Sequence, residues 1–443
     1  MDDDAASHPL VHGAFSLVDL LHSPLVLTPD PRRVVVLPFQ VSISSRESVA
    51  GVLARIKRVV GAVSAMAPTE RGAALARLDS EFAGRHRAFR DLCLERFGQI
   101  RDALGGEVAL DDDQATLAGA YFSHEYSFQA AAVLNPSVVR HPDQANLPAG
   151  AVRFILSTRC LGEGHISTIA FREGVFHADG AVDLTPCDTL AVAARPTHPG
   201  QSDGPVSLVR DSRAGLSETV IFPATRAQAN GLEDLRLVEF SDGGERTYLG
   251  TYTAFSGRDV CCELFETRDF EHFRLVPMRG AATFHKALAL FPRKINDRYA
   301  AIGRLDHESL YYLESDDRGV WNNGDRILEP RHDWDLMQVG NCGAPVELDE
   351  GWLLITHGVG PLRAYALGAA LLDKQDPRRV LARGRVPLLA PSPDGRDGYA
   401  PNVVYSCGFL RHGEWILLPY ATADTCIRFA SVRVRDLLAY LEA

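Results

Sequence analysis

The sequence lacks several features that would indicate particular classes of protein. No apolar run reaches the roughly 20 residues that a helix needs to cross a bilayer. The opening MDDDAASHPL has no basic start followed by a long apolar stretch, so it does not resemble a secretory signal. Positive charge is also scarce, because 57 Asp and Glu against 46 Lys and Arg give a net charge of −11. We therefore expect neither a membrane partner nor a general nucleic-acid partner.

Metal-binding and redox patterns are missing as well. The eight cysteines are scattered and form no CxxC pair, which argues against zinc and thioredoxin-type sites and fits a reduced, cytoplasmic compartment. No histidine and carboxylate group has a convincing metal-ligand spacing. Neither a Gly-rich phosphate loop nor a serine nucleophile elbow occurs in its proper context. We expect a cytoplasmic protein that uses no metal and no cofactor.

What is present divides the chain into two unlike parts, and the first is helical. Apolar residues at three-to-four spacing predict one helix that begins at a capping box of Ser44 and Glu47. They predict a second helix from near Thr69 to Gly105. We expect residues 1–115 to form a largely helical extension that packs on the main domain or on another subunit, and that thereby offers a contact for a homo-oligomer.

Residues 116–443 have the texture of an all-β domain. Short runs rich in Val, Ile, Tyr, Phe and Thr recur between turn residues. Some 300 residues of short strands are too many for one ordinary sandwich, which favours radially repeated blades, although periodicity alone does not set the number of blades. The expected strands are Val152–Ser157, Ile166–Phe171, Thr219–Phe222, Thr247–Phe255, Tyr299–Gly303, Gly351–His357, Tyr365–Leu372, Asn402–Phe409, Trp415–Tyr420 and Ile427–Val432.

The densest group of charged residues is the segment GLEDLR at 231–236. An arginine beside two carboxylates can separate their pKa values, because it stabilises the ionised form of one of them. Alternation along a strand sends Glu233 and Asp234 to opposite faces, so only one of them is expected to line a central pocket. For the isolated motif, a turn with a surface salt bridge is the simpler interpretation.

Further short blocks accompany this segment in a fixed order, which is more specific than any one block. Together they cover about residues 120–435, and the ordered series resembles glycoside hydrolase family 130, the family of mannoside phosphorylases and related β-mannosidases. The blocks are Leu134-Asn135-Pro136, the strand with Arg159, GLEDLR, His285-Lys286, Ile302-Gly303-Arg304, Gly340–Pro345, Gly351–Val359, Pro401–Val404 and Ala423-Asp424-Thr425.

The resemblance implies a five-bladed β-propeller with the sugar in an axial pocket and the N-terminal helical extension outside the common pattern. Asp234 corresponds to the family's acid in its GxEDPR block, although Leu235 replaces the proline here. The implied reaction is inverting phosphorolysis of a β-mannosidic bond in a mannose-containing oligosaccharide. Asp234 acts as the general acid through a sugar hydroxyl, and inorganic phosphate, the co-substrate, attacks to give α-mannose 1-phosphate.

The resemblance also assigns binding residues by their positions in the blocks. Each has an ordinary alternative, such as a salt bridge for an arginine, a solvated lysine, a core histidine or tyrosine, or a turn cap for an aspartate. The implied phosphate-binding residues are Arg159, Lys286, Arg304 and Tyr365, and the implied sugar-binding residues are Asn135, Arg159, His357 and Asp424.

Two departures from the family pattern weaken the phosphate assignment. Lys286 stands where many of the phosphorylases have arginine, and Gln338 stands where they have lysine. A point charge thus replaces a fork of donors, and one positive charge is lost. An inverting β-mannosidase is therefore an alternative, and it needs a base about 6.5–9.5 Å from the acid. Glu163, Glu239 and Glu314 are candidates for that base.

Two other interpretations stay open. One is a carbohydrate-binding propeller without catalysis, against which the retained acid at Asp234 argues, since binding alone needs no proton donor. The other is a protein-interaction propeller, although the sequence lacks recurring blade dipeptides. Glu163 and His165 lie in an expected turn between two strands, where polar side chains require no functional reason.

Overall fold

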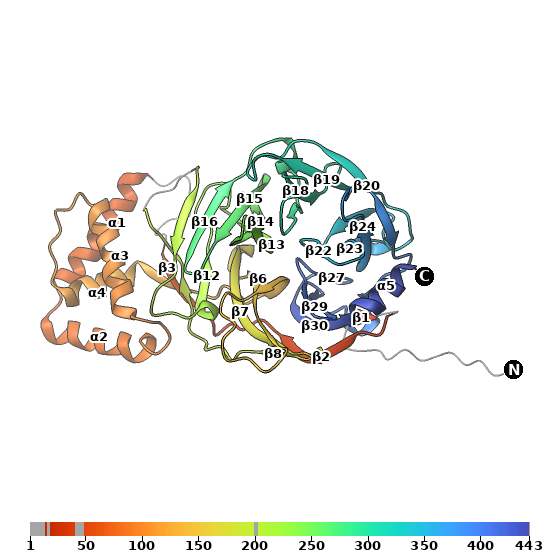
Figure 1. The fold of residues 1–443 in the computed structure, drawn as a ribbon. Coiled ribbons are helices and arrows are strands. Elements are labelled where there is room, and N and C mark those ends of the chain that lie inside the picture. The colour runs from red at the N-terminus through yellow and green to blue at the C-terminus, as the bar shows by residue number, and fades with distance from the viewer. Residues whose placement is uncertain (1–13, 16–17, 40–47, 199–202, 443) are drawn as a thin grey trace.

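The structure is a computed structural model that describes residues 14–15, 18–39, 48–198 and 203–442. Four helices lie to one side of a larger body of β-sheets, and the sheets follow one another around a shared central region (Figure 1). The prediction of a mostly β protein with helices near the N-terminus is confirmed. Within the described residues, no helix combines the length and the apolar character needed to span a bilayer.

The helical part differs in detail from the expected pair of helices. The second expected helix is interrupted after Phe82, and Ala88 has a left-handed φ of 50° just before the chain becomes helical again. The expected capping box of Ser44 and Glu47 lies outside the described residues, and Ser48 caps the first helix instead. The four helices are α1 (Val49–Ser64), α2 (Pro68–Phe82), α3 (Phe89–Ala103) and α4 (Asp112–Tyr121).

Helix α4 was not expected, although its start carries a clear signal. The Asp111 side chain accepts from the Gln114 backbone N–H at 2.8 Å, and the Gln114 side chain accepts from the Asp111 N–H at 3.1 Å. This capping box supplies partners for two backbone donors that a helix start otherwise leaves free. The expected boundary between residues 115 and 116 falls inside α4, so the helical part extends to Tyr121.

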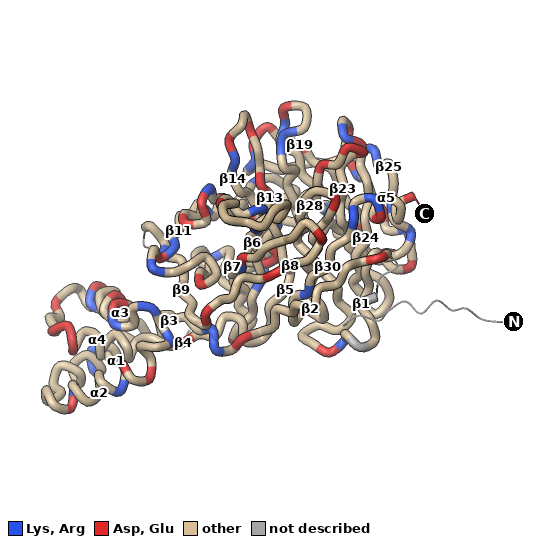
Figure 2. The backbone as a smooth tube through the Cα atoms, turned by 60° about the horizontal axis from the view of Figure 1, so that its bottom comes forward, with Lys and Arg blue, Asp and Glu red and all other residues tan. Residues whose placement is uncertain are grey.

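Ion pairs tie α3 to the β-sheet body, beside which the helices project (Figure 2). Arg87, just before α3, pairs with Glu218 at 2.6 Å. Glu95 within α3 pairs with Arg195 at 3.3 Å. Because these pairs are partly or largely exposed, each contributes little on its own. Together they hold one helix face against the body.

The largest sheet has twelve strands and contains two antiparallel groups. One group is β5–β8, the other includes β13–β16, and they meet where Gly231 pairs with Ser167. The strands are β5 (Ala132–Arg140), β6 (Val152–Leu161), β7 (Ser167–Phe176), β8 (Val182–Leu184), β9 (Val192–Ala193), β10 (Arg195–Pro196), β11 (Val206–Val209), β12 (Thr219–Ile221), β13 (Gly231–Asp242), β14 (Glu245–Phe255), β15 (Val260–Thr267) and β16 (His272–Pro277).

Three smaller sheets and two strand pairs complete the body. The four-stranded sheet contains β17 (Ala289–Leu290), β18 (Tyr299–Gly303), β19 (Leu310–Ser315) and β20 (Gly324–Leu328). One five-stranded sheet contains β21 (Gln338–Asn341), β22 (Val346–Glu347), β23 (Trp352–Val359), β24 (Tyr365–Leu372) and β25 (Val380–Arg383). The other contains β2 (Leu21–Leu27), β27 (Val404–Tyr405), β28 (Leu410–His412), β29 (Trp415–Thr422) and β30 (Cys426–Arg433), and the pairs are β3 (Val35–Pro38) with β4 (Ser123–Tyr126) and β1 (Ala14–Phe15) with β26 (Ala390–Pro391).

Strands from the two ends of the chain share one sheet. Strand β2 pairs antiparallel with β30, with Leu21 opposite Ser431 and Leu27 opposite Ile427. The C-terminal helix α5 (Val434–Glu442) follows β30 directly and buries Leu437 in the same region. An N-terminal segment therefore belongs to the β-sheet body and not only to the helical part.

Hydrophobic clusters join each sheet to the next. One cluster connects the twelve-stranded sheet to the four-stranded sheet, and a second connects that sheet to β21–β25. A third connects β21–β25 to β27–β30. The last connects β29 and β30 back to β6 and β7, where Phe429 and Leu417 pack with Phe154. Burial of apolar side chains between sheets thus runs around the whole body.

Candidate functional site

A cavity of about 180 Å³ lies where the twelve-stranded, four-stranded and both five-stranded sheets converge. The cavity has room for several water molecules and suits a small polar group. All eight residues singled out by the resemblance line it, although they span 290 positions of the sequence. They are Asn135, Arg159, Asp234, Lys286, Arg304, His357, Tyr365 and Asp424, and the cavity is further lined by Arg236, Ala287, Gln338, Arg363, Val403 and Tyr405.

A β-bulge places Asp234 in this cavity. The pairing of β13 with β14 shifts register between Glu233 and Arg236, and Asp234 has a left-handed φ of 57°. A bulge inserts an unpaired residue and re-aims its side chain. Of the two carboxylates only Asp234 lines the cavity, as alternation along the strand predicts, although the bulge interrupts the regular pairing after Glu233. Arg159 contacts both carboxylates, at 2.8 Å from Glu233 and 3.1 Å from Asp234.

The surroundings of Asp234 hold its carboxylate in the ionised form. Burial alone would raise the pKa, but the positive charges of Arg159, Arg236 and Lys286 outweigh it, and the pKa is lowered to about 2. Asn135 adds a donor, since its Nδ2 lies 2.6 Å from Oδ1 of Asp234. To act as a proton donor, Asp234 must first take up a proton. This requires added negative charge nearby that raises its pKa.

Glu233 lies behind the cavity and fixes two of its cations. The residue is 7% exposed, and its two oxygens contact different partners. Oε1 accepts from Arg159 at 2.8 Å, and Oε2 accepts from Nζ of Lys286 at 2.7 Å. Glu233 thereby positions both side chains without itself lining the cavity.

The other cations of the cavity have no carboxylate partner within the described part of the chain. Arg236 donates to the Asp234 carbonyl oxygen and to the Tyr405 hydroxyl, both at 2.8 Å. The buried Nε of Arg304 has no hydrogen-bond partner among the described residues, and burial lowers the pKa of this guanidinium. Arg363 lies over the ring of Tyr365, 5.8 Å from its centroid.

The cavity therefore carries an excess of positive charge. Five cationic side chains line it, whereas its lining carboxylates are Asp234 and Asp424. Even when Glu233 behind them is included, two positive charges remain. Buried, partly unpartnered guanidinium groups are costly in the absence of an anion. The arrangement is suited to a divalent anion with several acceptor oxygens.

Asp424 differs from Asp234 in its preferred charge. Burial and the negative charge of Asp234 raise its pKa to about 6, against the opposing effect of Arg159 and Arg363. Its backbone, like that of Ala423, is left-handed with φ of 48°. Asp424 is therefore a carboxyl group that exchanges a proton near neutral pH.

His357 is a neutral hydrogen-bonding group in this site. Burial together with Arg304 and Arg236 holds its pKa well below the usual range. Its Nδ1 lies 3.2 Å from the Asn341 carbonyl oxygen, and its Nε2 lies 3.3 Å from Nε2 of Gln338. These contacts fit an Nδ1–H donor and an Nε2 acceptor.

Three charged or polar residues of the cavity were not assigned to the site from the sequence, and the three candidate bases lie outside it. Arg236 was considered only as a partner for a carboxylate, and Arg363 and Tyr405 not at all. Arg236 ends the GLEDLR block, Tyr405 directly follows the block Pro401–Val404, and Arg363 lies a few residues after Gly351–Val359, which was the available signal. The candidate bases Glu163, Glu239 and Glu314 do not line the cavity, and the latter two pair with Arg246 and Arg298.

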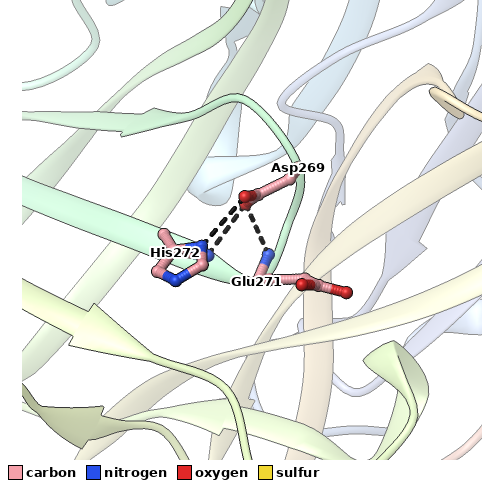
Figure 3. A group of neighbouring side chains, drawn as sticks. All are labelled: Asp269, Glu271 and His272. Carbon is pink, nitrogen blue, oxygen red and sulfur yellow. Dashed lines mark hydrogen bonds and ion pairs between the residues drawn. The ribbon is translucent and has the colours of Figure 1, made fainter. Parts of the chain in front are cut away.

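Within the described residues, one group of three side chains has the geometry to hold a metal ion (Figure 3). It comprises Asp269, Glu271 and His272, all of them exposed. Oδ1 of Asp269 accepts from the backbone N–H groups of Glu271 and His272 at 2.8 Å, and its Oδ2 lies 2.9 Å from Nδ1 of His272. These bonds are those of a capped turn and account for the group without an ion.

Comparison with known proteins identifies relatives for this chain. A sequence model of glycoside hydrolase family 130, described as beta-1,4-mannooligosaccharide phosphorylase, matches residues 212–443. The 1,2-beta-oligomannan phosphorylase of Thermoanaerobacter sp. (strain X514) is 34% identical over 230 residues, which are 50% of this chain and 75% of that protein. The beta-1,2-mannobiose phosphorylase of Listeria innocua is 31% identical over 229 residues, covering 50% of this chain and 63% of that protein.

Solved structures share the fold of the β-sheet body. The Listeria innocua β-1,2-mannobiose phosphorylase in complex with β-1,2-mannobiose has a TM-score of 0.51 at 21% identity and covers 70% of this chain and 92% of its own. A structure described with the β-1,2-mannoside hydrolases of family 130 has a TM-score of 0.53 at 16% identity and covers 70% and 87%. Because the family's sequence model spans more than half of the chain, and a phosphorylase relative matches over three quarters of its own length, this chain belongs to glycoside hydrolase family 130.

Proposed function

We propose that the protein cleaves a β-mannosidic bond of an oligosaccharide by inverting phosphorolysis and releases α-mannose 1-phosphate. The observation that carries this proposal is the excess of two positive charges around Asp234, with Arg304 left without a hydrogen-bond partner at its buried Nε. A phosphate dianion supplies the missing charge and the acceptor oxygens. The relatives described as mannoside phosphorylases support the same reaction.

In the proposed mechanism Asp234 is the general acid. Its low pKa in the protein alone results from Arg159, Arg236 and Lys286. A bound phosphate dianion offsets these charges, which raises the pKa of Asp234 and allows it to take up a proton. Asp234 then donates this proton, through a sugar hydroxyl, to the glycosidic oxygen. A phosphate oxygen attacks the anomeric carbon from the opposite face, and the leaving sugar departs with the proton.

The remaining cavity residues divide between the two substrates. Phosphate is proposed to bind to Arg159, Lys286, Arg304 and Tyr365. The positive charge of Arg236 also favours the bound anion. The hydroxyls of the mannosyl group are proposed to bind to Asn135, Arg159, His357 and Asp424. Inorganic phosphate is then a co-substrate, and no step of this mechanism requires a metal or an organic cofactor.

An inverting β-mannosidase is the second candidate, and Asp424 is the observation that favours it. It is another carboxyl group in the same cavity, and its pKa of about 6 suits a group that exchanges protons near neutral pH. As a base, Asp424 would remove a proton from an attacking water while Asp234 protonates the leaving oxygen.

The deciding experiment uses β-1,2- and β-1,4-mannobiose with and without inorganic phosphate. Phosphorolysis gives mannose 1-phosphate, and only when phosphate is present. Hydrolysis gives free mannose at the same rate in both conditions. A protein that binds mannobiose without forming either product would be a carbohydrate-binding propeller, and that outcome would remove both enzymatic proposals.

The proposed architecture is a five-bladed β-propeller. The hydrophobic clusters run from sheet to sheet and return to the first sheet. The twelve-stranded sheet counts as two blades, because β5–β8 and β13–β16 form separate antiparallel groups with a cluster between them. These two, the four-stranded sheet and the two five-stranded sheets make five.

We further propose a cytoplasmic location and a homo-oligomer formed through the helical part. All eight cysteines are free, which fits a reducing compartment. A chain that begins near residue 115 is a poor test of the oligomer, since it also loses β2 and β3. Light scattering on the full chain, before and after Val49→Glu at the 76%-exposed start of α1, tests the contact directly.

A further inference from the structure

Two loops that adjoin the residues around Asp234 and Asp424 are joined by an exposed pair of side chains. The hydroxyl of Tyr399 lies 2.5 Å from Nδ1 of His165, and the rings are 5.9 Å apart at 59°. The two residues are 234 positions apart in the sequence. Tyr399 nevertheless remains 46% exposed. A large ring is therefore held in place while much of its surface stays open to solvent.

Both loops are continuous with the residues around Asp234 and Asp424. On one side, Tyr399 N–H donates to the Thr425 hydroxyl at 2.6 Å, directly after Asp424. Ala400 N–H donates to the Ala423 carbonyl oxygen at 3.0 Å, directly before it. The segment that carries Tyr399 therefore wraps the turn that presents Asp424 to the cavity.

On the other side, His165 ends the short turn between β6 and β7. Two residues later, the Ser167 hydroxyl accepts from Nε of Arg159 at 2.9 Å, and Arg159 contacts Asp234. His165 itself has a left-handed φ of 59°, after Gly164 with φ of 70°. Such a conformation is unfavourable for a non-glycine residue and needs support from its surroundings. The bond to Tyr399 supplies one such support.

We propose that Tyr399 is the platform on which the leaving sugar of the β-mannoside rests, with His165 as the residue that positions its ring. This inference rests on the proposed function and deepens it. Sugars present C–H groups on one face and hydroxyls at the edge, so a fixed, amphipathic aromatic ring suits them. The cavity is small and lined mainly by polar side chains, and both the mannosyl group and phosphate are proposed to bind in it. The second sugar must therefore lie at the rim, beside the acid that protonates the bond between the two.

The test compares the two sugars in the synthetic direction, from α-mannose 1-phosphate and mannose. We expect Tyr399→Ala to raise the KM for the acceptor mannose about tenfold, the effect of losing a good aromatic contact. The KM for α-mannose 1-phosphate is expected to change less than about twofold. Tyr399→Phe keeps the ring but loses the hydrogen bond to His165, so it should give an intermediate KM for the acceptor. His165→Asn, which tolerates a left-handed backbone, should give an intermediate KM for the acceptor.

Tyr121→Ala is the matched control, because Tyr121 is 53% exposed at the end of α4, away from the cavity. It should leave both KM values unchanged. An unchanged acceptor KM in Tyr399→Ala, or an equal rise for both substrates, would overturn the proposal. Turnover by the unaltered protein tests the proposed function separately. Calorimetric titration of β-mannobiose into Asp234→Asn, with Tyr399 intact or replaced by alanine, requires no turnover, and equal affinities there would also overturn the platform.

Discussion

A bulge in β13 and the turn between β29 and β30 each present a carboxyl group to the same cavity, yet the two groups have pKa values shifted in opposite directions. Asp234 and Asp424 both have left-handed backbones and both are buried. Three cations act on Asp234 and hold its pKa at about 2. Asp424 faces the negative charge of Asp234, and its pKa rises to about 6. Because both groups are buried, their different pKa values follow from their positions relative to the cations and to each other.

The largest expected effect concerns the roles of the two groups. Asp234→Asn preserves a residue type that tolerates the left-handed backbone, but it removes the proton donor. We expect kcat for phosphorolysis to fall by about 10²–10⁴-fold, the usual contribution of general acid catalysis. Asp424→Asn should lower kcat less and mainly raise the KM for the mannoside. If Asp424→Asn is the more damaging of the two in steady-state kinetics, the assignment of the acid is reversed.

The next effect concerns Arg304, a cation of the cavity that is not paired with either carboxyl group. Arg304 has no carboxylate partner among the described residues, so its donors are available for an anion. Arg304→Ala should raise the KM for phosphate about 10–100-fold, as expected from losing a hydrogen bond to a charged group. Arg304→Lys retains the positive charge but loses the forked donors of the guanidinium. Its KM for phosphate should lie between those of the unaltered protein and Arg304→Ala. A phosphate KM that stays unchanged in Arg304→Ala would place the anion elsewhere.

Stability should respond to the two substitutions with opposite signs at pH 7. The pKa of Asp234 is lowered, so its stabilising contribution is present above about pH 4 and is lost as the pH falls toward 2. The pKa of Asp424 is raised, so stability falls as the pH rises from about 4 to 6. Asp234→Asn should therefore lower the free energy of unfolding at pH 7 by about 2 kcal/mol, whereas Asp424→Asn should increase it by a similar amount.

Urea denaturation at pH 7 and pH 4 measures this difference. At pH 4 the gain from Asp424→Asn should largely vanish, because Asp424 is then protonated in the folded protein and partly protonated in the unfolded chain. A loss of stability in both variants at pH 7 would mean that Asp424 has a cationic partner comparable to that of Asp234.

The smallest effect separates the neighbours of the two groups. Arg363 lowers the pKa of Asp424, and Lys286 lowers that of Asp234. Infrared titration of the protonated carboxyl band, assigned by its loss in Asp424→Asn, should have a midpoint near pH 6. Arg363→Ala should raise this midpoint by less than a full pH unit, since Arg363 is a minor contributor. Lys286→Met should leave the midpoint nearly unchanged, and an equal shift in both variants would contradict the separation.

The sequence predicted strands well where the local residue pattern alone determines the strand. The expected runs at Tyr299–Gly303 and Tyr365–Leu372 coincide with β18 and β24, because short apolar runs there are bounded by turn residues. The run at 402–409 was overestimated. Strand β27 ends at Tyr405, and Cys407 N–H instead donates to the carbonyl oxygen of Pro136, a distant partner that local pattern does not reveal.

The site residues were predictable for a different reason. The order of the short blocks brought together residues that no spacing rule would group, and all eight line one cavity. Alternation predicted that only one of Glu233 and Asp234 lines the cavity, but it did not reveal the bulge, because a bulge depends on the partner strand as well as on the local sequence. The place of Arg363 in the cavity could not be predicted from the sequence, because it results from two consecutive left-handed residues, Leu362 and Arg363, in a short loop.

The pairing of β2 with β30 makes assembly of the catalytic centre dependent on both ends of the chain. Strand β2 is synthesised first but has no partner until β30 has left the ribosome, some 400 residues later. At ordinary translation rates of about 5–20 residues per second, that interval lasts about 20–80 seconds. Asp424 lies in the turn between β29 and β30. A nascent chain that stalls before this point lacks both Asp424 and the partner of β2, so we expect it to be inactive.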